Sequence, residues 1–141
     1  MDNVISAAKA AIIEAVLEGT AERLGDITEQ VIARTYAKCP AAKASFEFQS
    51  VWNITALEGR MVEETLLCVM NWYENPAQAQ LVLQDTIPHH VDTFDIPLDQ
   101  FYSVFEGLFD VVAQNIPQDE SAQIDAWQTL MDEMRAYIHS D

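Results

Sequence analysis

An all-α fold is predicted by three features of the sequence. Apolar residues recur at steps of three and four along most of the chain, which is the periodicity of helices that bury one face. No segment alternates apolar and polar residues as a half-buried strand does, and no internal repeat is evident. Half of the 141 residues are hydrophobic and only 4 are glycine, so a single helical domain over residues 1–141 is expected rather than disorder.

The first third of the chain predicts two helices and an irregular corner. A four-residue apolar repeat over residues 3–22 predicts the first helix, which ends near Gly25. The capping-box pattern of residues 26–29 begins a second helix. Pro40 ends that helix because proline donates no backbone hydrogen bond. The segment 41–51 is short, aromatic and without regular periodicity, and it predicts a corner.

Five helices are predicted in the remainder of the chain. Asn75 directly before Pro76, and Thr86 two residues before Pro88, are suited to helix caps, and each proline is interpreted as the first-turn proline of a short helix. Pro97 opens the next helix and Pro117 follows its end. Negative charge stands at the head of the last helix, where the helix dipole favours it. The predicted ranges are residues 52–73, 75–83, 86–93, 96–115 and 119–138.

The composition excludes several classes of function. The 23 acidic and 7 basic residues give a net charge of −16, and the cations are scattered, so neither nucleic acid nor a membrane surface is an expected partner. No apolar run is long enough to span a bilayer and no leader-like start is present, so a cytoplasmic protein is expected. Cys39 and Cys68 lack partners at zinc-ligand spacing and are expected to be buried thiols. No phosphate-binding loop, nucleophile elbow or metalloprotease histidine pair occurs, so a hydrolytic or group-transfer enzyme is not expected.

The order of the elements and the spacing of a few residues resemble the globin family over nearly the whole chain. Pro40 followed six residues later by Phe46 is similar to the family's turn proline and haem-packing phenylalanine. His90 precedes the Ile96-Pro97 pair by six residues, the expected position of the proximal histidine. The Ala126-Trp127 pair is similar to one in bacterial members. The resemblance, to a bacterial-type single-domain globin, implies a globin-like fold of about seven to eight helices around one core.

The same resemblance implies a haem b cofactor with His90 as the metal ligand. The chemistry agrees, because a neutral imidazole supplies the axial nitrogen that haem iron needs. His89 is then a candidate partner for a haem propionate, since only one of two neighbouring helical residues can face the iron. His139, near the end of the chain, is expected to be solvated. The implied cofactor-binding residues are Phe46, Ile32, Leu57, Arg60 and Met61 on the distal side, Ile96, Phe101 and Val104 on the proximal side, and His89.

Three points stay open in the sequence. Counting forward from Phe46 and back from His90 gives distal positions a few residues apart, near Leu57. Arg60 either binds a propionate or the gas ligand, or is a solvated residue near the glutamates that follow it. Pro88 is expected to force a helix to begin just before His90, which would leave the ligand in a first turn with little backbone behind it.

The function implied by the resemblance is reversible binding of O2, NO or CO in storage, transport or sensing, and NO dioxygenase- or peroxidase-like side activity is compatible with bound haem. An apolar distal pocket without a histidine should favour CO relative to O2. The alternative is a haem-free globin-fold sensor or protein-interaction module, and a bilin-binding relative is a weaker variant because it needs an exposed cysteine. A homodimer is suggested by family analogy alone.

Overall fold

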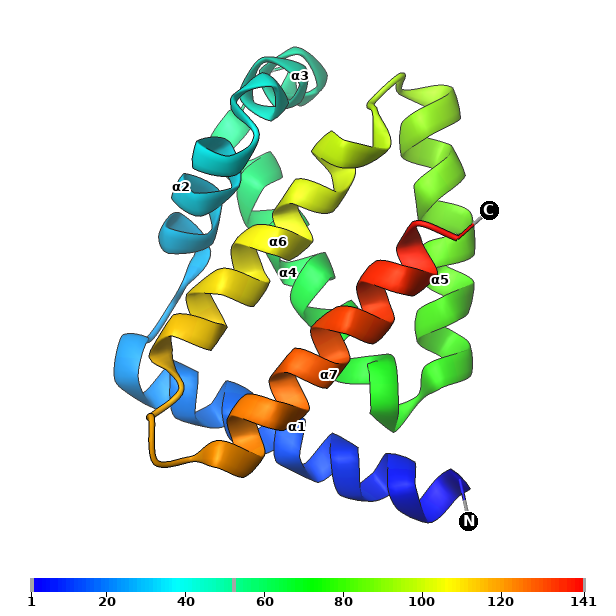
Figure 1. Ribbon diagram of the computed structural model, residues 1–141. Helices are drawn as coiled ribbons and strands as arrows, with labels where there is room; N and C mark the ends of the chain where they lie inside the picture. Colours follow the sequence, from blue (N-terminus) through cyan, green and yellow to red (C-terminus); the bar gives the residue numbers. More distant parts are fainter. Residues whose placement is uncertain (1, 52, 141) are drawn as a thin grey trace.

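The computed structural model describes the backbone of residues 2–51 and 53–140 and the side chains of residues 7–51 and 53–140 (Figure 1). Over this part of the chain it contains seven α-helices and no strand, so the predicted all-α class is confirmed, and the helices pack around a core in a manner consistent with a globin-like fold. They are α1 (Asp2–Leu24), α2 (Thr28–Lys38), α3 (Pro40–Ser50), α4 (Ile54–Glu74), α5 (Pro76–Pro88), α6 (Leu98–Asn115) and α7 (Ser121–Ile138), with a π-helical turn η1 (His89–Thr93) directly after α5.

Local sequence signals set most of the helix ends. Gly25 closes α1 in the left-handed region, with φ of 68°, where a side chain would be strained. The Asp26 carboxylate accepts the backbone N–H of Thr28 at 2.9 Å, but the predicted capping box does not form, because α2 begins at Thr28 and its N-cap is Ile27, which makes no side-chain cap hydrogen bond. The Asn53 side chain accepts the backbone N–H of Ala56 at 3.0 Å and caps α4.

Two predicted boundaries are wrong. The segment 41–51 lies almost wholly within α3, which Pro40 begins as a first-turn proline. The expected second start near Pro88 does not exist, because α5 runs without a break from Pro76 to Pro88 and continues into η1. Pro88 has φ of −60°, which suits a helix, and the N–H of His89 restores bonding by donating to the carbonyls of both Asp85 and Thr86.

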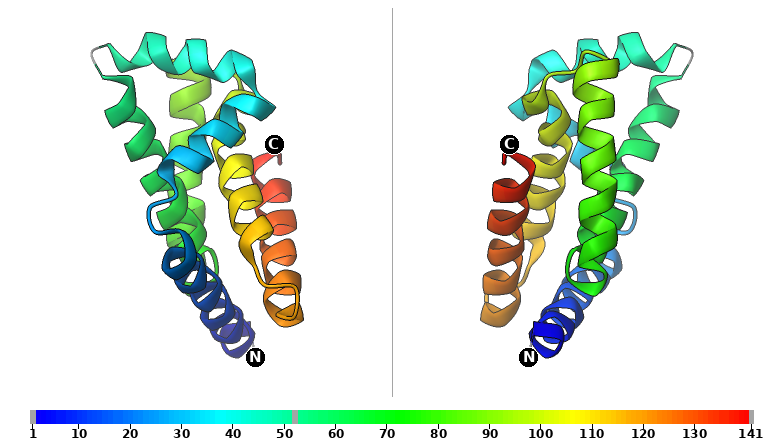
Figure 2. Two further views of the ribbon diagram at one scale, coloured as in Figure 1. Left: turned by 90° about the vertical axis from the view of Figure 1, so that its left-hand side faces the viewer. Right: turned by 90° about the vertical axis from the view of Figure 1, so that its right-hand side faces the viewer.

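The helices form two layers. In the side views α4 and α5 lie on one side and α6 and α7 on the other, with α3 across one end and α1 across the opposite end (Figure 2). Helices α2 and α6 lie close together at Gly107, where an added Cβ would lie 2.7 Å from the carbonyl oxygen of Val31. Within the described part of the chain, no helix combines the length and the apolar character needed to cross a bilayer.

The buried apolar residues fall into two groups. The main core joins α1, α2, α4, α5, α6 and α7 and contains Trp127, whose indole N–H donates to the carbonyl of Phe109 at 3.0 Å. A smaller group, here called the corner cluster, consists of buried Ala42, Phe46, Ile96 and Val104, and Leu57 and Met61 are among the partly buried residues packed against it.

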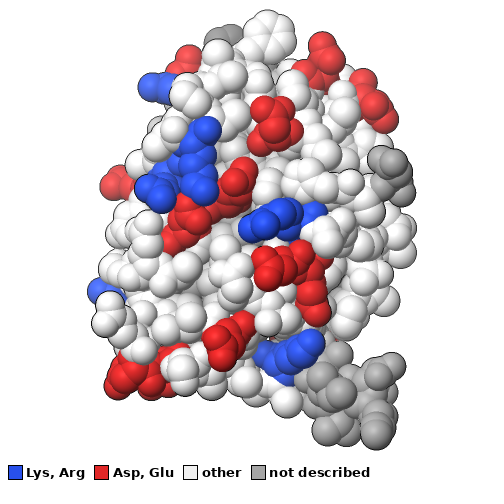
Figure 3. All heavy atoms as spheres, in the orientation of Figure 1, with Lys and Arg blue, Asp and Glu red and all other residues white. Residues whose placement is uncertain are grey.

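Polar contacts at the surface join helices that are distant in sequence. Glu133 of α7 accepts hydrogen bonds from the Tyr73 hydroxyl and from the Trp72 indole of α4, and Lys9 of α1 lies 3.7 Å from its other oxygen. On the face shown in Figure 3, basic side chains occur singly or in small groups beside carboxylates and form no continuous positive stripe. The Asp110 carboxylate, for example, pairs with both Arg34 at 3.0 Å and Lys38 at 2.8 Å.

Candidate functional site

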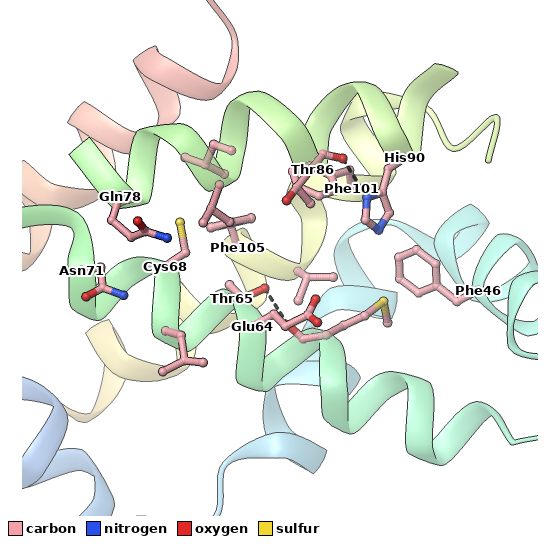
Figure 4. A pocket seen from close by; sticks show the side chains of 16 residues that line it. Phe46, Glu64, Thr65, Cys68, Asn71, Gln78, Thr86, His90, Phe101 and Phe105 are labelled. Carbon is pink, nitrogen blue, oxygen red and sulfur yellow. Dashed lines mark hydrogen bonds between the residues drawn. The ribbon is translucent and has the colours of Figure 1, made fainter. Parts of the chain in front are cut away.

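A cavity of about 390 Å³ lies between α4, α5 and α6. Phe46 of α3 lies at one end, and Asn71 of α4 and Gln78 of α5 lie at the other (Figure 4). Its volume falls within the range of small-molecule sites, about 300–1,000 Å³. The cavity borders both apolar groups, because Cys68 and Phe105 belong to the main core while Phe46 belongs to the corner cluster.

His90 is held so that one ring nitrogen remains available to a ligand. Its Nδ1 lies 2.9 Å from the backbone carbonyl oxygen of Thr86. A carbonyl only accepts hydrogen bonds, so Nδ1 is the donor of this contact, and in the neutral tautomer with this proton Nε2 has the lone pair. Figure 4 shows the second ring nitrogen turned away from Thr86 and into the cavity. The ring is half-buried and packs against Phe101, with ring centroids 5.0 Å apart.

The continuous helix through Pro88 supplies this support. Because α5 does not restart, the Thr86 carbonyl lies one helical turn behind His90 and meets its ring. The expectation that His90 would lie in a first turn is therefore corrected. Beyond the ring, the N–H of Ile96 donates to the His90 carbonyl at 2.9 Å, which fixes the backbone on the other side of η1. Such π-turns are rare and occur frequently at functional sites.

His89 and His139 both lie outside the cavity lining. His89 is exposed, and its ring packs edge-on against Phe94 at a centroid distance of 4.5 Å. As expected for neighbouring residues of one helical turn, only His90 of the pair faces the cavity. His139 is exposed, as predicted for a residue near the end of the chain.

The α4 wall of the cavity carries Met61, Thr65 and Cys68 at steps of four and three residues. The Thr65 hydroxyl donates to the backbone carbonyl of Met61 at 2.8 Å, so its proton is engaged within the helix. Cys68 is buried, and burial raises the pKa of its thiol from 9.0 to about 11, which keeps the sulfur protonated at neutral pH. The prediction of buried, unpaired thiols is confirmed for Cys68, whereas Cys39 is only half-buried.

The cavity opens between α4 and α5. Leu67 and Val82 line it and are 49% and 42% exposed, and the exposed Glu64 and Gln78 also line this side. Glu64 is the only carboxylate among the lining residues, and no lysine or arginine lines the cavity in the described part of the chain. The charge at the opening is therefore negative.

Half of the predicted site residues line this cavity, and the others lie around it. Leu57 and Ile96 are in or against the corner cluster. Ile32 is buried in the main core. Arg60 is exposed, does not line the cavity, and forms no ion pair within 4.0 Å with a carboxylate of the described residues. The lining residues that were predicted are Phe46, Met61, His90, Phe101 and Val104.

Sequence reasoning missed the α5 wall and the far end of the cavity. Ala79, Leu83, Thr86 and His90 follow one another at steps of four, three and four and all line the cavity. That periodicity is visible in the sequence, but it is lost if the helix is interrupted at Pro88. The lining also contains the polar side chains Asn71 and Gln78, which were not among the predicted residues and lie at the end away from Phe46 (Figure 4).

The donor set of the site is one imidazole nitrogen within an apolar cavity. Among the described residues, no group of three or more histidine, cysteine, aspartate or glutamate side chains is arranged to hold a bare metal ion. A single anchored imidazole instead suits a cofactor that brings its own equatorial ligands. The fixed Nδ1–H is the usual partner arrangement behind a metal-binding Nε2.

Comparisons of this chain with models of protein families, with curated proteins and with solved structures found no match.

Proposed function

We propose that the protein is a haem-binding globin that reversibly binds a diatomic gas, O2, NO or CO, with His90 as the proximal iron ligand. The observation that carries this proposal is the His90 ring, whose Nδ1 is anchored by the Thr86 carbonyl at 2.9 Å and whose Nε2 faces an apolar cavity of about 390 Å³. A hydrogen bond to the ring nitrogen that does not bind the metal fixes both the tautomer and the direction of a metal-binding imidazole. His90 would hold the haem, and the bound haem would supply the iron that binds the gas.

The side chains that line the cavity are suited to contact a flat apolar ligand. Phe101, Val104 and Phe105 of α6 line the cavity beside His90, and Phe46 lies at the same end. The opening between α4 and α5 would allow the polar edge of such a ligand to reach solvent. Arg60 stands one helical turn before Glu64 of this opening and is the cation we expect to meet a propionate, because no other basic residue lies on α4.

The wall opposite His90 offers few hydrogen-bond donors to a bound gas. The Thr65 proton is engaged by the Met61 carbonyl, and an ionised Glu64 only accepts hydrogen bonds. Asn71 and Gln78 can donate, but they lie at the end of the cavity away from His90 and Phe46 (Figure 4). Bound O2 gains most from a distal donor, so we expect CO to be favoured relative to O2.

An absorption spectrum of the purified full chain with added haemin tests the proposal. We expect a sharp Soret band that persists in His89→Ala and is lost or strongly weakened in His90→Ala. His89 is the matched control because it is adjacent and exposed and does not line the cavity. A chain that takes up no haemin, or identical spectra for both variants and the wild type, contradicts the proposal.

A haem-free module is the second candidate, and exposed apolar residues at the cavity opening favour it. Leu67 of α4 and Val82 of α5 line the cavity and are 49% and 42% exposed, and Met70 and Leu81 on the same two helices are also exposed although they do not line it. Apolar side chains gathered at such an opening suit contact with a protein or with a long apolar ligand. Colourless protein that binds no haemin would support this candidate over the first.

A further inference from the structure

We propose that the outer face of α4 and α5 is a docking surface for an amphipathic helix of another protein, one with apolar residues along one side and lysine or arginine near each end. The inference goes beyond the proposed haem function, because such a partner lies over the cavity opening from outside and needs no group from within the cavity. It also gives a chemical class to the protein partner that the haem-free candidate leaves unspecified.

The α4 part of this face has two apolar residues between two carboxylates. Glu63, Leu67, Met70 and Glu74 follow one another at steps of four, three and four residues, so they lie along one side of the helix, and all four are exposed. Glu63 and Glu74 are separated by three helical turns, which is about 16 Å along the axis. The apolar centre of this stripe is therefore bounded by negative charge at both ends.

The α5 part of the face continues the apolar surface. Leu81 is 59% exposed and Val82 is 42% exposed, and the exposed Asp85 follows them on the same helix. Helices α4 and α5 lie side by side (Figure 2), and Leu67 and Val82 both line the cavity where it opens between them. The exposed apolar side chains of the two helices therefore form one surface around that opening, here called the apolar strip and consisting of Leu67, Met70, Leu81 and Val82.

Charge determines which partner fits the apolar strip. The sequence from Glu63 to Asp85 contains no lysine or arginine, and the nearest basic residue of α4, Arg60, precedes this span. A second copy of a chain with a net charge of −16, or an anionic membrane, would bring negative charge against these carboxylates. An amphipathic helix with cations about three turns apart instead places apolar residues on the strip and positive charge beside Glu63 and Glu74.

Fluorescence anisotropy of a labelled synthetic helix added to the purified full chain tests the inference. The probe has about 14 residues, or four turns, with leucine along one side and lysine at both ends. A scrambled peptide of identical composition is its control. One double variant, Glu63→Gln with Glu74→Gln, removes the two carboxylates. A second, Met70→Ser with Leu81→Ser, removes apolar contacts that do not line the cavity.

The matched charge control is Asp119→Asn with Asp125→Asn, because both residues are exposed and neither belongs to α4 or α5. We expect this control to bind the probe as the wild type does. The probe's Kd should rise about tenfold when the two carboxylates of α4 are neutralised, since two surface ion pairs are lost. It should rise about tenfold or more when the two apolar side chains are replaced by serine.

Three results would overturn the inference: no binding of the probe, equal binding of the scrambled peptide, or equal weakening in the charge control. Dimerisation in size-exclusion chromatography, or association with phosphatidylcholine vesicles, that is lost in Met70→Ser with Leu81→Ser assigns the apolar strip to another occupant and also overturns it. All of these measurements use the chain without added haemin, so their failure is distinguishable from absence of the Soret band.

Discussion

The contact of α2 with α6 at Gly107 provides a sharp test of the packing. In Gly107→Ala the new Cβ would lie 2.5 Å from Thr35 Oγ1, 2.7 Å from the Val31 carbonyl oxygen and 3.2 Å from the Thr35 backbone nitrogen. Ordinary contact begins near 3.4 Å, so the Val31 carbonyl must retreat by about 0.7 Å. Two of the three atoms are backbone, so α2 must shift as a body rather than rotate one side chain.

The expected magnitude follows from two opposing effects. Overpacking a close-packed site costs about 1–3 kcal/mol, and the upper end applies because backbone must yield. Alanine recovers about 1 kcal/mol of helix propensity relative to glycine. The net loss in the free energy of unfolding is then about 2 kcal/mol.

Urea denaturation followed by circular dichroism measures this loss, with Gly59→Ala as the matched control. Gly59 lies inside α4, and a Cβ built there meets nothing within 4 Å. Only the propensity gain applies, so this variant should be more stable than the wild type by about 0.5–1 kcal/mol. Equal stabilities for the two variants, or a neutral Gly107→Ala, would refute the close approach of α2 and α6.

The remaining predictions concern three single side chains. Trp127→Phe removes the donor to the buried Phe109 carbonyl and leaves a void, so the free energy of unfolding should fall by about 2–4 kcal/mol in urea denaturation; an unchanged midpoint would contradict this packing. The Cys68 thiol, with its pKa raised from 9.0 to about 11, should react with iodoacetamide at pH 8 far more slowly than Cys39, as mass spectrometry of the alkylated peptides can measure. Because the unfolded thiol ionises at lower pH than the folded one, this group's contribution to stability is complete below pH 9 and is lost between pH 9 and 11; that dependence should disappear in Cys68→Ala. Pro88→Ala restores a backbone donor to the Gln84 carbonyl within a continuous helix, so thermal unfolding should shift upward by several degrees, and a downward shift would indicate that the proline is needed where it stands.

The periodicity of apolar residues predicted the helices well where glycine and proline mark the same helix ends that the buried apolar stripe indicates. The apolar stripes of α6 and α7 are largely buried, although Ile124 is 39% exposed, and on α4 the stripe is buried only from Thr65 onward. The positions assigned to Phe101 and Val104 do line the cavity. The prediction failed at Pro88, because a proline that follows a possible cap residue can begin a helix or lie near the end of one that is already formed. The difference depends on whether the neighbouring N–H groups find other carbonyls, as that of His89 does.

The distal side was harder to predict for a geometrical reason. Leu57 and Met61 are separated by one helical turn, and which of them reaches the cavity depends on how far α4 extends beyond the corner formed by α3. In the structure Met61 lines the cavity, whereas Leu57 does not line it and packs against the corner cluster. The position of Arg60 likewise depends on the rotation of α4 about its axis, which hydrophobic periodicity defines only coarsely.

The division of the apolar residues into a main core and a corner cluster has a thermodynamic consequence. The cavity lies along the seam between them, with Cys68, Leu83 and Phe105 on one border and Phe46 and Val104 on the other. With the seam empty, the end formed by α3 can open locally at a free energy below that of global unfolding, and its amides should exchange with solvent faster than those of α6. Any apolar molecule that fills the seam joins the two borders into one cooperative unit, so occupancy would slow amide exchange in α3 as well as raise the melting temperature.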